Sequence, residues 1–157
     1  MEEEVVAQQN RELIIENVLP ARQVGNKDGF EHTVNLTGTS AATAANYSTI
    51  YNVDRACELI RVRVSYTNAS SSGTLMLERL TGTTAPGSGD NILVTTISLS
   101  STANTIITRQ KTDLQNTILR PGDRVAIEDG GTLTNLQNLV ITLYYTPIGK
   151  GNYQRYA

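Results

Sequence analysis

Cysteine and histidine, which can act together as nucleophile and base, occur once each in this 157-residue sequence, as Cys57 and His32. A cysteine thiolate beside a histidine can act as a nucleophile, so the two would form a candidate site if the fold brought them together. His32, however, alternates with Phe30 and Val34, as residues on one face of a strand do. A single cysteine can form neither an internal disulfide nor a cysteine-rich zinc site. We therefore expect both residues to be structural, with His32 packed in a strand.

Acidic residues gather at Asp123 and at the adjacent pair Glu128 and Asp129. Paired carboxyl groups can hydrolyse glycosidic bonds, and together with Asp90 the pair could offer oxygen ligands to calcium. Asp123 lies in an expected turn and the pair at an expected strand end, where acids are ordinary solubilising residues, and the spacing is not that of a calcium loop. We therefore predict no catalytic residue, no cofactor and no metal, and hence a protein that is not an enzyme.

The glycine-rich stretch 81–91 (TGTTAPGSGDN) has some likeness to a phosphate-binding loop. Such a loop needs Gly-Lys followed by Ser or Thr at the start of a helix. Here Asp90 and Asn91 lead instead into a strand-like segment. The stretch is therefore expected to be a long turn without a ligand.

Bulk composition excludes some partners. The net charge is -2, so no basic field would attract nucleic acid or an anionic membrane. No apolar stretch approaches the roughly 18 to 20 residues needed to span a bilayer. Glu2, Glu3 and Glu4 make the N-terminus acidic, whereas a secretory signal begins with basic residues. We expect a soluble protein, made in the cytoplasm, that binds neither nucleic acid nor membrane.

Residues 30–147 consist of short runs rich in Thr, Val, Ile and Leu, separated by Gly, Asn, Ser and Asp. β-Branched and aromatic residues favour a pleated, half-buried surface, and the separating residues form turns. The pattern predicts an all-β domain, an antiparallel, jelly-roll-like β-sandwich of about eight strands. The predicted strands are residues 30–36, 47–53, 59–67, 74–80, 92–99, 105–108, 124–128 and 139–146.

Two connections in this domain have a local signature. The turn-forming stretch 68–73 (NASSSG) separates residues 59–67 from 74–80, which are expected to pair as a hairpin. Residues 120–123 (RPGD) carry proline at the second and glycine at the third position, which matches a type II turn.

Arg61 and Arg63 are the candidates for binding inside the domain. Strict alternation over residues 59–66 puts both on one strand face together with Leu59, and Ile60 on the other. The two arginines could pair with acids of a neighbouring subunit, hold a small anion, or be solvated.

The chain ends differ from the domain in composition, so the sequence divides into an arm (1–29), the β-domain (30–147) and a tail (148–157). Residues 1–17 favour a short helix that Pro20 would end, although an extended arm fits equally well. The tail contains tyrosine and arginine, which are enriched at protein interfaces, and is either a docking segment or a disordered end. The candidate partner-binding residues are Leu13, Ile14, Ile15, Arg61, Arg63, Tyr153, Arg155 and Tyr156.

Three stretches in the C-terminal half resemble the small β-rich virion structural proteins of tailed bacteriophages, of the capsid decoration or cement type. They are residues 81–91 (TGTTAPGSGDN), 120–127 (RPGDRVAI) and 130–136 (GGTLTNL). The resemblance implies a virion component at the capsid surface, made in the host cytoplasm, that binds the major capsid protein. It also implies a homo-oligomer, for which a trimer is plausible. The resemblance supplies no catalytic residues.

Two other functions stay open. The domain could be a carbohydrate- or receptor-binding module of a head fibre or tail, in which Tyr47, Tyr51 or Tyr66 would stack on a sugar; the lack of tryptophan argues against this. It could also be a small hydrolase that uses Glu128 or Asp123. The leading hypothesis is a non-enzymatic capsid decoration protein whose arm or tail contacts the capsid.

Overall fold

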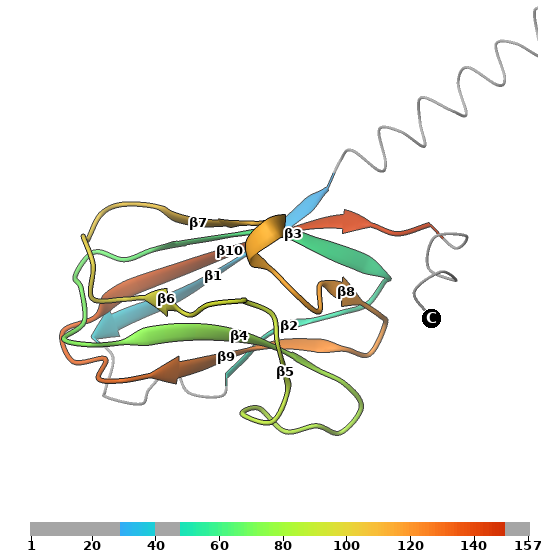
Figure 1. Cartoon of the computed structure of the whole chain (residues 1–157), viewed down its shortest axis with the longest axis horizontal. Helices are drawn as coiled ribbons and strands as arrows, with labels where there is room; N and C mark the ends of the chain where they lie inside the picture. Colours follow the sequence, from blue (N-terminus) through green and yellow to red (C-terminus); the bar gives the residue numbers. More distant parts are fainter. Residues whose placement is uncertain (1–28, 40–47, 150–157) are drawn as a thin grey trace, which may run out of the picture.

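Two antiparallel β-sheets packed face to face make up the part of the chain that the computed structural model describes, residues 29–39 and 48–149 (Figure 1). The strands are β1 (Phe30–Thr39), β2 (Ser48–Asn52), β3 (Cys57–Ser65), β4 (Thr74–Leu80), β5 (Asp90–Asn91), β6 (Ile97–Ser98), β7 (Ile107–Gln110), β8 (Ile118–Leu119), β9 (Arg124–Gly130) and β10 (Gln137–Pro147), with a 3-10 turn η1 (Lys111–Asp113). Sheet A has the order β1-β10-β3-β7, with β8 beside β3. Sheet B has the order β2-β9-β4-β5, with β6 beside β4. The predicted arm helix falls outside the described residues.

The strand order is that of a jelly roll. β5 and β6 both pair with β4, and β7 and β8 both pair with β3, so the strands fill eight positions. Numbered along the chain, these positions read 1-8-3-6 in sheet A and 2-7-4-5 in sheet B, because the chain changes sheet at nearly every connection. The predicted all-β, jelly-roll-like sandwich is confirmed, and the order excludes a simple meander.

The predicted hairpin between residues 59–67 and 74–80 is wrong. β3 lies in sheet A, where it pairs with β10, β7 and β8, whereas β4 lies in sheet B beside β9. The connection crosses from one sheet to the other and is held by Ser70, whose amide donates to Leu99 O at 2.8 Å and whose hydroxyl accepts the Gly73 amide at 2.8 Å. Each of the two strands has one apolar face. Because the chain passes from sheet A to sheet B between them, these two faces pack against each other in the core.

The expected alternation in β3 is interrupted at Ile60. Tyr144 of β10 lies opposite Arg61 and Tyr145 lies opposite Leu59, which leaves Ile60 as an extra residue, a β-bulge. Leu59 is therefore fully buried on the core side, while Arg61 points to the other side. The prediction that Leu59 and Arg61 share a face is wrong for this reason.

The predicted strand 92–99 is also wrong as a continuous element. Only its last part belongs to a strand, β6, while β5 lies just before it. Ile92 and Leu93 are both fully buried although they are neighbours, which a regular strand with one solvated face does not allow. The segment predicted at 105–108 is displaced toward the C-terminus, as β7.

The core lies between the two sheets. From sheet A it receives alternate residues of β10 and β3, and from sheet B alternate residues of β4 and β9. The main contributors are Leu59, Val62, Val64, Leu139, Ile141, Leu143, Tyr145, Leu75, Leu77, Val125 and Ile127. Each fully buried aliphatic side chain of this kind contributes about 1.5 to 3 kcal/mol through the hydrophobic effect.

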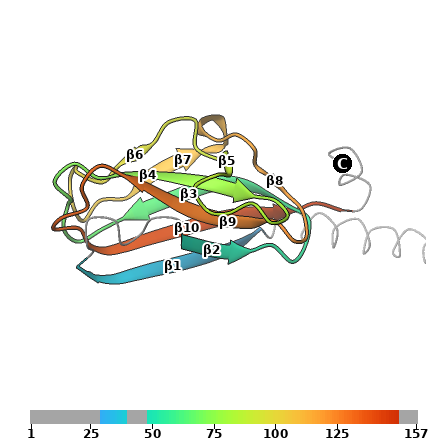
Figure 2. The ribbon, with the colours of Figure 1, turned by 90° about the horizontal axis from the view of Figure 1, so that it is seen from below.

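One long side of the sandwich is closed by a histidine. β1 and β2 lie together along this side although they belong to different sheets (Figure 2). A ring N–H of His32 on β1 donates to the carbonyl oxygen of Ile50 on β2, with 2.8 Å between the two atoms. The His32 ring also packs 5.0 Å from that of Tyr51. The prediction of a packed strand histidine is confirmed, and His32 links the two sheets.

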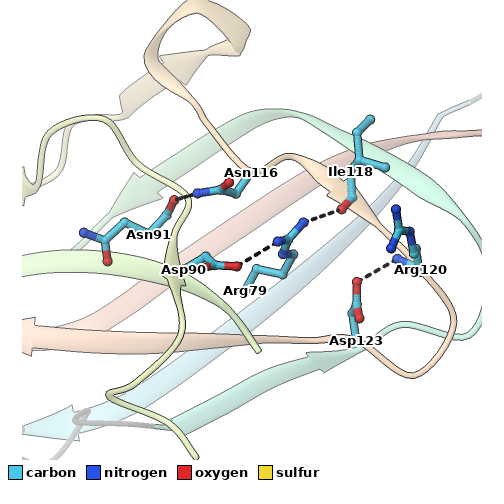
Figure 3. Close-up of polar contacts among 7 residues, drawn as sticks. All are labelled: Arg79, Asp90, Asn91, Asn116, Ile118, Arg120 and Asp123. Carbon is cyan, nitrogen blue, oxygen red and sulfur yellow. Dashed lines mark hydrogen bonds and ion pairs between the residues drawn. The ribbon is translucent and has the colours of Figure 1, made fainter. Parts of the chain in front are cut away.

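Polar contacts close the opposite side (Figure 3). Arg79 on β4 forms an ion pair with Asp90 at 2.7 Å and donates to the carbonyl oxygen of Ile118 on β8 at 3.3 Å. The Asn116 side chain donates to Asn91 O at 2.8 Å. Because β4 and β5 belong to sheet B and β8 to sheet A, these contacts join the sheets.

The predicted type II turn at residues 120–123 is confirmed. The Asp123 amide donates to Arg120 O at 2.9 Å, and Gly122 has a φ of 94°, as the third position of this turn requires. The Asp123 carboxylate accepts the Arg120 amide at 2.9 Å (Figure 3). Asp123 is thus a structural residue of the turn.

We expect Gly131→Ala to lower the free energy of unfolding by more than about 2 kcal/mol. A left-handed backbone costs a residue with a Cβ about 1 to 2 kcal/mol. Gly131 has a φ of 67°, and a Cβ there would also overlap the Ser72 carbonyl oxygen. Gly122→Ala has the positive φ with open space, and Gly149→Ala has neither feature. In chemical denaturation, the loss in the free energy of unfolding should be largest for Gly131→Ala, smaller for Gly122→Ala and smallest for Gly149→Ala. Equal losses for Gly131→Ala and Gly122→Ala would show that Ser72 moves aside.

Candidate interaction surface

The outer face of sheet A brings together the two arginines predicted from sequence and a tyrosine that was not. Arg61 lies opposite Tyr144 and Arg63 opposite Thr142 in the β3–β10 ladder, so all four side chains point away from the core. Thr142 in turn forms a hydroxyl–hydroxyl hydrogen bond with Thr33 of β1 at 3.1 Å. Arg61, Arg63 and Tyr144 are called the Arg-Tyr face below.

The tyrosine holds both guanidinium groups. The Arg61 guanidinium carbon lies 4.0 Å from the centre of the Tyr144 ring, a cation–π contact worth about 0.5 to 2 kcal/mol. Arg63 donates a long hydrogen bond of 3.4 Å to the Tyr144 hydroxyl. Among the described residues no carboxylate forms an ion pair with either arginine; the ion pairs found there are Arg79–Asp90 and Lys111–Glu58. Neither positive charge is therefore held in an ion pair within the described residues; Glu31, opposite Tyr144 in the β1–β10 ladder, is an acid on the same face.

A shallow hollow lies on each side of Tyr144. The smaller, of about 120 Å³, is lined by Arg63 with the aliphatic side chains of Val140 and Ile106, and Ile106 is 57% exposed. The larger, of about 310 Å³, is lined by Arg61 and by Gly29, Phe30, Glu31, Ile60, Tyr144 and Tyr145. Each hollow thus offers a guanidinium beside apolar side chains, and the larger one also contains the acid Glu31. A guanidinium beside aliphatic side chains suits a segment that has both acidic and aliphatic residues.

Both ends of the described chain leave from this region. Phe30 at the start of β1 lies opposite Tyr145 near the end of β10, so the two strand ends lie side by side (Figure 1). Gly29 itself lines the larger hollow. The other predicted binding residues lie outside the described residues; they are Leu13, Ile14, Ile15, Tyr153, Arg155 and Tyr156.

The environment of Cys57 opposes nucleophilic chemistry. Its side chain is fully buried in the core, and burial raises the pKa of the thiol to about 12. The thiol would therefore be protonated at neutral pH, whereas the thiolate is the reactive form. His32 is engaged with Ile50 instead. Cys57 is a core residue.

The acids predicted from sequence are separated by the fold. Asp123 is used in its turn, and Glu128 and Asp129, as neighbours in β9, point to opposite faces of sheet B. Asp129 is 9% exposed, and burial raises the pKa of its carboxyl group. The prediction that Glu128 and Asp129 are ordinary solubilising residues is wrong. Asp129 is almost fully buried and Glu128 is half-buried.

An unexpected acid, Glu78, shares the outer face of sheet B with Glu128. Glu78 is only 1% exposed although it points away from the core, because the loop 81–89 folds over it. Its carboxylate accepts the Gly87 amide at 2.8 Å, and its side chain also hydrogen-bonds Glu128. The glycine-rich loop therefore binds a carboxylate of its own chain, and Arg124 fixes the same loop by donating to Thr84 O at 2.6 Å.

Two of the three tyrosines considered for sugar stacking, Tyr51 and Tyr66, are not free surface rings. Tyr66 is 2% exposed, and its hydroxyl lies 2.9 Å from that of Ser101. Tyr51 stacks on Tyr145 with ring centres 4.8 Å apart. Tyr47 lies outside the described residues. In the described ranges, no cluster of three or more His, Cys, Asp or Glu side chains is arranged to hold a metal ion, and no helix could span a membrane.

Sequence reasoning missed Tyr144, Val140 and Ile106 as parts of the site. The alternation of residues 139–146 could have placed Tyr144 and Val140 on the solvent face, because Ile141 and Leu143 mark the core face. No sequence signal joins Tyr144 to Arg63, which is 81 residues away along the chain, and none joins Ile106 to either arginine.

No model of a known protein family matches the chain, and no curated protein sequence is significantly similar to it. Among solved structures, a chain of the capsid of Ralstonia phage GP4 is similar with a TM-score of 0.53 and 10% identity, over 78% of this chain and 86% of that chain. A chain of the cyanophage Pam1 capsid asymmetric unit (TM-score 0.43, 15% identity, 76% and 86%) and one of Bacillus endospore appendages (0.35, 15%, 77% and 89%) are more distant. The similarity to the Ralstonia phage GP4 chain shows a shared fold. The TM-scores for the cyanophage and Bacillus chains are too low to support a shared fold.

We expect Glu128→Gln to raise the melting temperature at pH 7.5 and to leave it unchanged at pH 4. Burial, the hydrogen bond with Glu78 and the charge of Glu78 all raise the pKa of Glu128 above its ordinary value. A carboxyl group with a higher pKa in the folded state stabilises the fold in acid, and this contribution is lost as the pH rises through the folded pKa. Glutamine keeps a donor for Glu78 at every pH.

The control for this measurement is Glu31→Gln, which changes an exposed acid on β1. It should shift the melting temperature little at either pH. A gain of the same size at pH 4 and pH 7.5 for Glu128→Gln would contradict the assignment of the effect to ionisation.

Proposed function

We propose that this protein is a non-enzymatic structural component of a bacteriophage virion. The observation that carries the proposal is the jelly-roll likeness to a chain of the Ralstonia phage GP4 capsid, which covers most of both chains. Jelly rolls are common in viral capsids, although lectins use them too. The buried, protonated thiol of Cys57 also favours a structural role over nucleophilic catalysis.

More specifically, we propose a decoration or cement protein that binds the major capsid protein at the capsid surface. The Arg-Tyr face supports this, because fixed positive charges beside apolar hollows suit an acidic surface or segment of a protein partner. The glycan-binding alternative finds no such support, since the ring of Tyr144 is already covered by Arg61 and Tyr66 is buried.

The chain ends are proposed to contribute to the same contact. The segments with Leu13, Ile14 and Ile15, and with Tyr153, Arg155 and Tyr156, attach where β1 begins and β10 ends, beside the larger hollow. A partner bound at this end of sheet A would meet the Arg-Tyr face and both segments together.

A homo-oligomer, with a trimer as the simplest form, is part of the proposal. β1 is ten residues long, and within residues 29–39 and 48–149 it pairs on one side only, with β10. A long unpaired edge readily accepts a further strand, so proteins cover such edges, and symmetric association is one way to do so.

We expect Arg61→Gln/Arg63→Gln to weaken binding to capsids about tenfold or more, because hydrogen bonds to charged groups contribute about 1.5 to 3 kcal/mol each. The measurement is co-sedimentation with empty capsids assembled from the major capsid protein of the phage that encodes this chain. Thr83→Glu/Thr95→Glu, at two exposed loop residues outside sheet A, changes the net charge by the same amount and should bind as the unaltered chain does.

An unaltered chain that does not sediment with capsids, and is absent from purified virions by mass spectrometry, would refute the virion role. Equal weakening by both variants would refute the role of the Arg-Tyr face and leave only a net-charge effect. Binding to a glycan array without capsid binding would favour the receptor-binding function instead.

A further inference from the structure

The Arg-Tyr face carries two charges that have no ion pair in the described part of the chain, with one acid, Glu31, in the lining of the larger hollow. Arg61 makes no hydrogen bond or ion pair there beyond its contact with the Tyr144 ring, and its Nε is buried without an acceptor. Arg63 has only the long bond to the Tyr144 hydroxyl. Since burying part of a guanidinium without a partner is costly, the face is set up to receive a carboxylate.

The sequence before Gly29 contains a segment of complementary character. Residues 1–16 hold five acids and one base, and Glu12 and Glu16 flank Leu13, Ile14 and Ile15. Its carboxylates and aliphatic side chains could contact the guanidinium groups and the apolar side chains of the face. Arg63 lies beside Ile106 and Val140 in the smaller hollow, and Arg61 lies beside Ile60 in the larger one.

The point of attachment places this segment within reach. Residue 16 is 13 residues from Gly29, which itself lines the larger hollow, and an extended chain of that length spans up to about 43 Å. A short tether also gives a local concentration of about millimolar, which favours docking on the same chain over docking on a second copy.

We propose that residues 12–16 dock on the Arg-Tyr face of their own chain, with Glu12 and Glu16 beside Arg61 and Arg63 and the aliphatic residues in the hollows. The arm then covers the surface in the free protein, so any acidic partner must displace it. The inference concerns the isolated chain and does not depend on the proposed function: it is tested without capsids, and its failure would leave capsid binding untouched.

The test is photo-crosslinking of the full chain with benzoylphenylalanine in place of Ile14, followed by mass spectrometry of the products. The expected product is a crosslink within one chain, to peptides of β3, β10 or the segment that contains Ile106. Its yield should fall at least fivefold in 1 M NaCl, where the screening length is about 3 Å.

Two matched variants test the proposed ion pairs, one by changing the arginines of the face and one by changing the glutamates of the arm. Arg61→Gln/Arg63→Gln should abolish most of the crosslink, and Glu12→Gln/Glu16→Gln, which changes no residue of the sandwich, should do the same. Thr83→Glu/Thr95→Glu serves as the charge-matched control and should retain it. Crosslinks between two chains would overturn docking on the same chain, and a pattern that neither variant changes would overturn the role of the Arg-Tyr face.

Discussion

The extra residue at Ile60 lets both halves of β3 turn their apolar side chains to the core. β3 is a central strand that pairs with β10 on one side and with β7 and β8 on the other. Leu59 before the bulge and Val62 after it both have to enter the core. In an unbroken alternation, burying Leu59 would bury Arg61 as well, and an unpaired buried charge costs on the order of several kcal/mol. The bulge lets Leu59 and Val62 both enter the core while Arg61 stays on the outer face, where it forms part of the Arg-Tyr face.

Local sequence patterns predict the parts of this fold that are determined locally. The bounds of β4 and the turn at residues 120–123 agree with the structure because propensity and turn chemistry act over a few residues. The partner of β4 is different, since it depends on which apolar face meets which across the core. A short connection such as 68–73 fits a hairpin as well as a crossing, so the sequence alone favours the wrong pairing.

The candidate surface shows the same division. Arg61 and Arg63 are visible in the sequence because two residues apart in a strand means one face. Their partner Tyr144 is not, because the contact joins β3 to the last strand of the chain. Glu78 is the opposite case: the alternation correctly points it outward, yet the loop 81–89 covers it, and no periodicity reports on a loop that folds back.

The position of β10 has a consequence for the order of events during synthesis. Of the described strands, β10 is the last to leave the ribosome, and it pairs with β1, the first of them, and with β3. Until it emerges, Tyr144 cannot orient the arginines, and β1 has no neighbour in its sheet. Pairing between strands so distant along the chain is also slow. A nascent chain therefore exposes no finished Arg-Tyr face, so recognition through this surface is delayed until the whole β-domain has been made and folded.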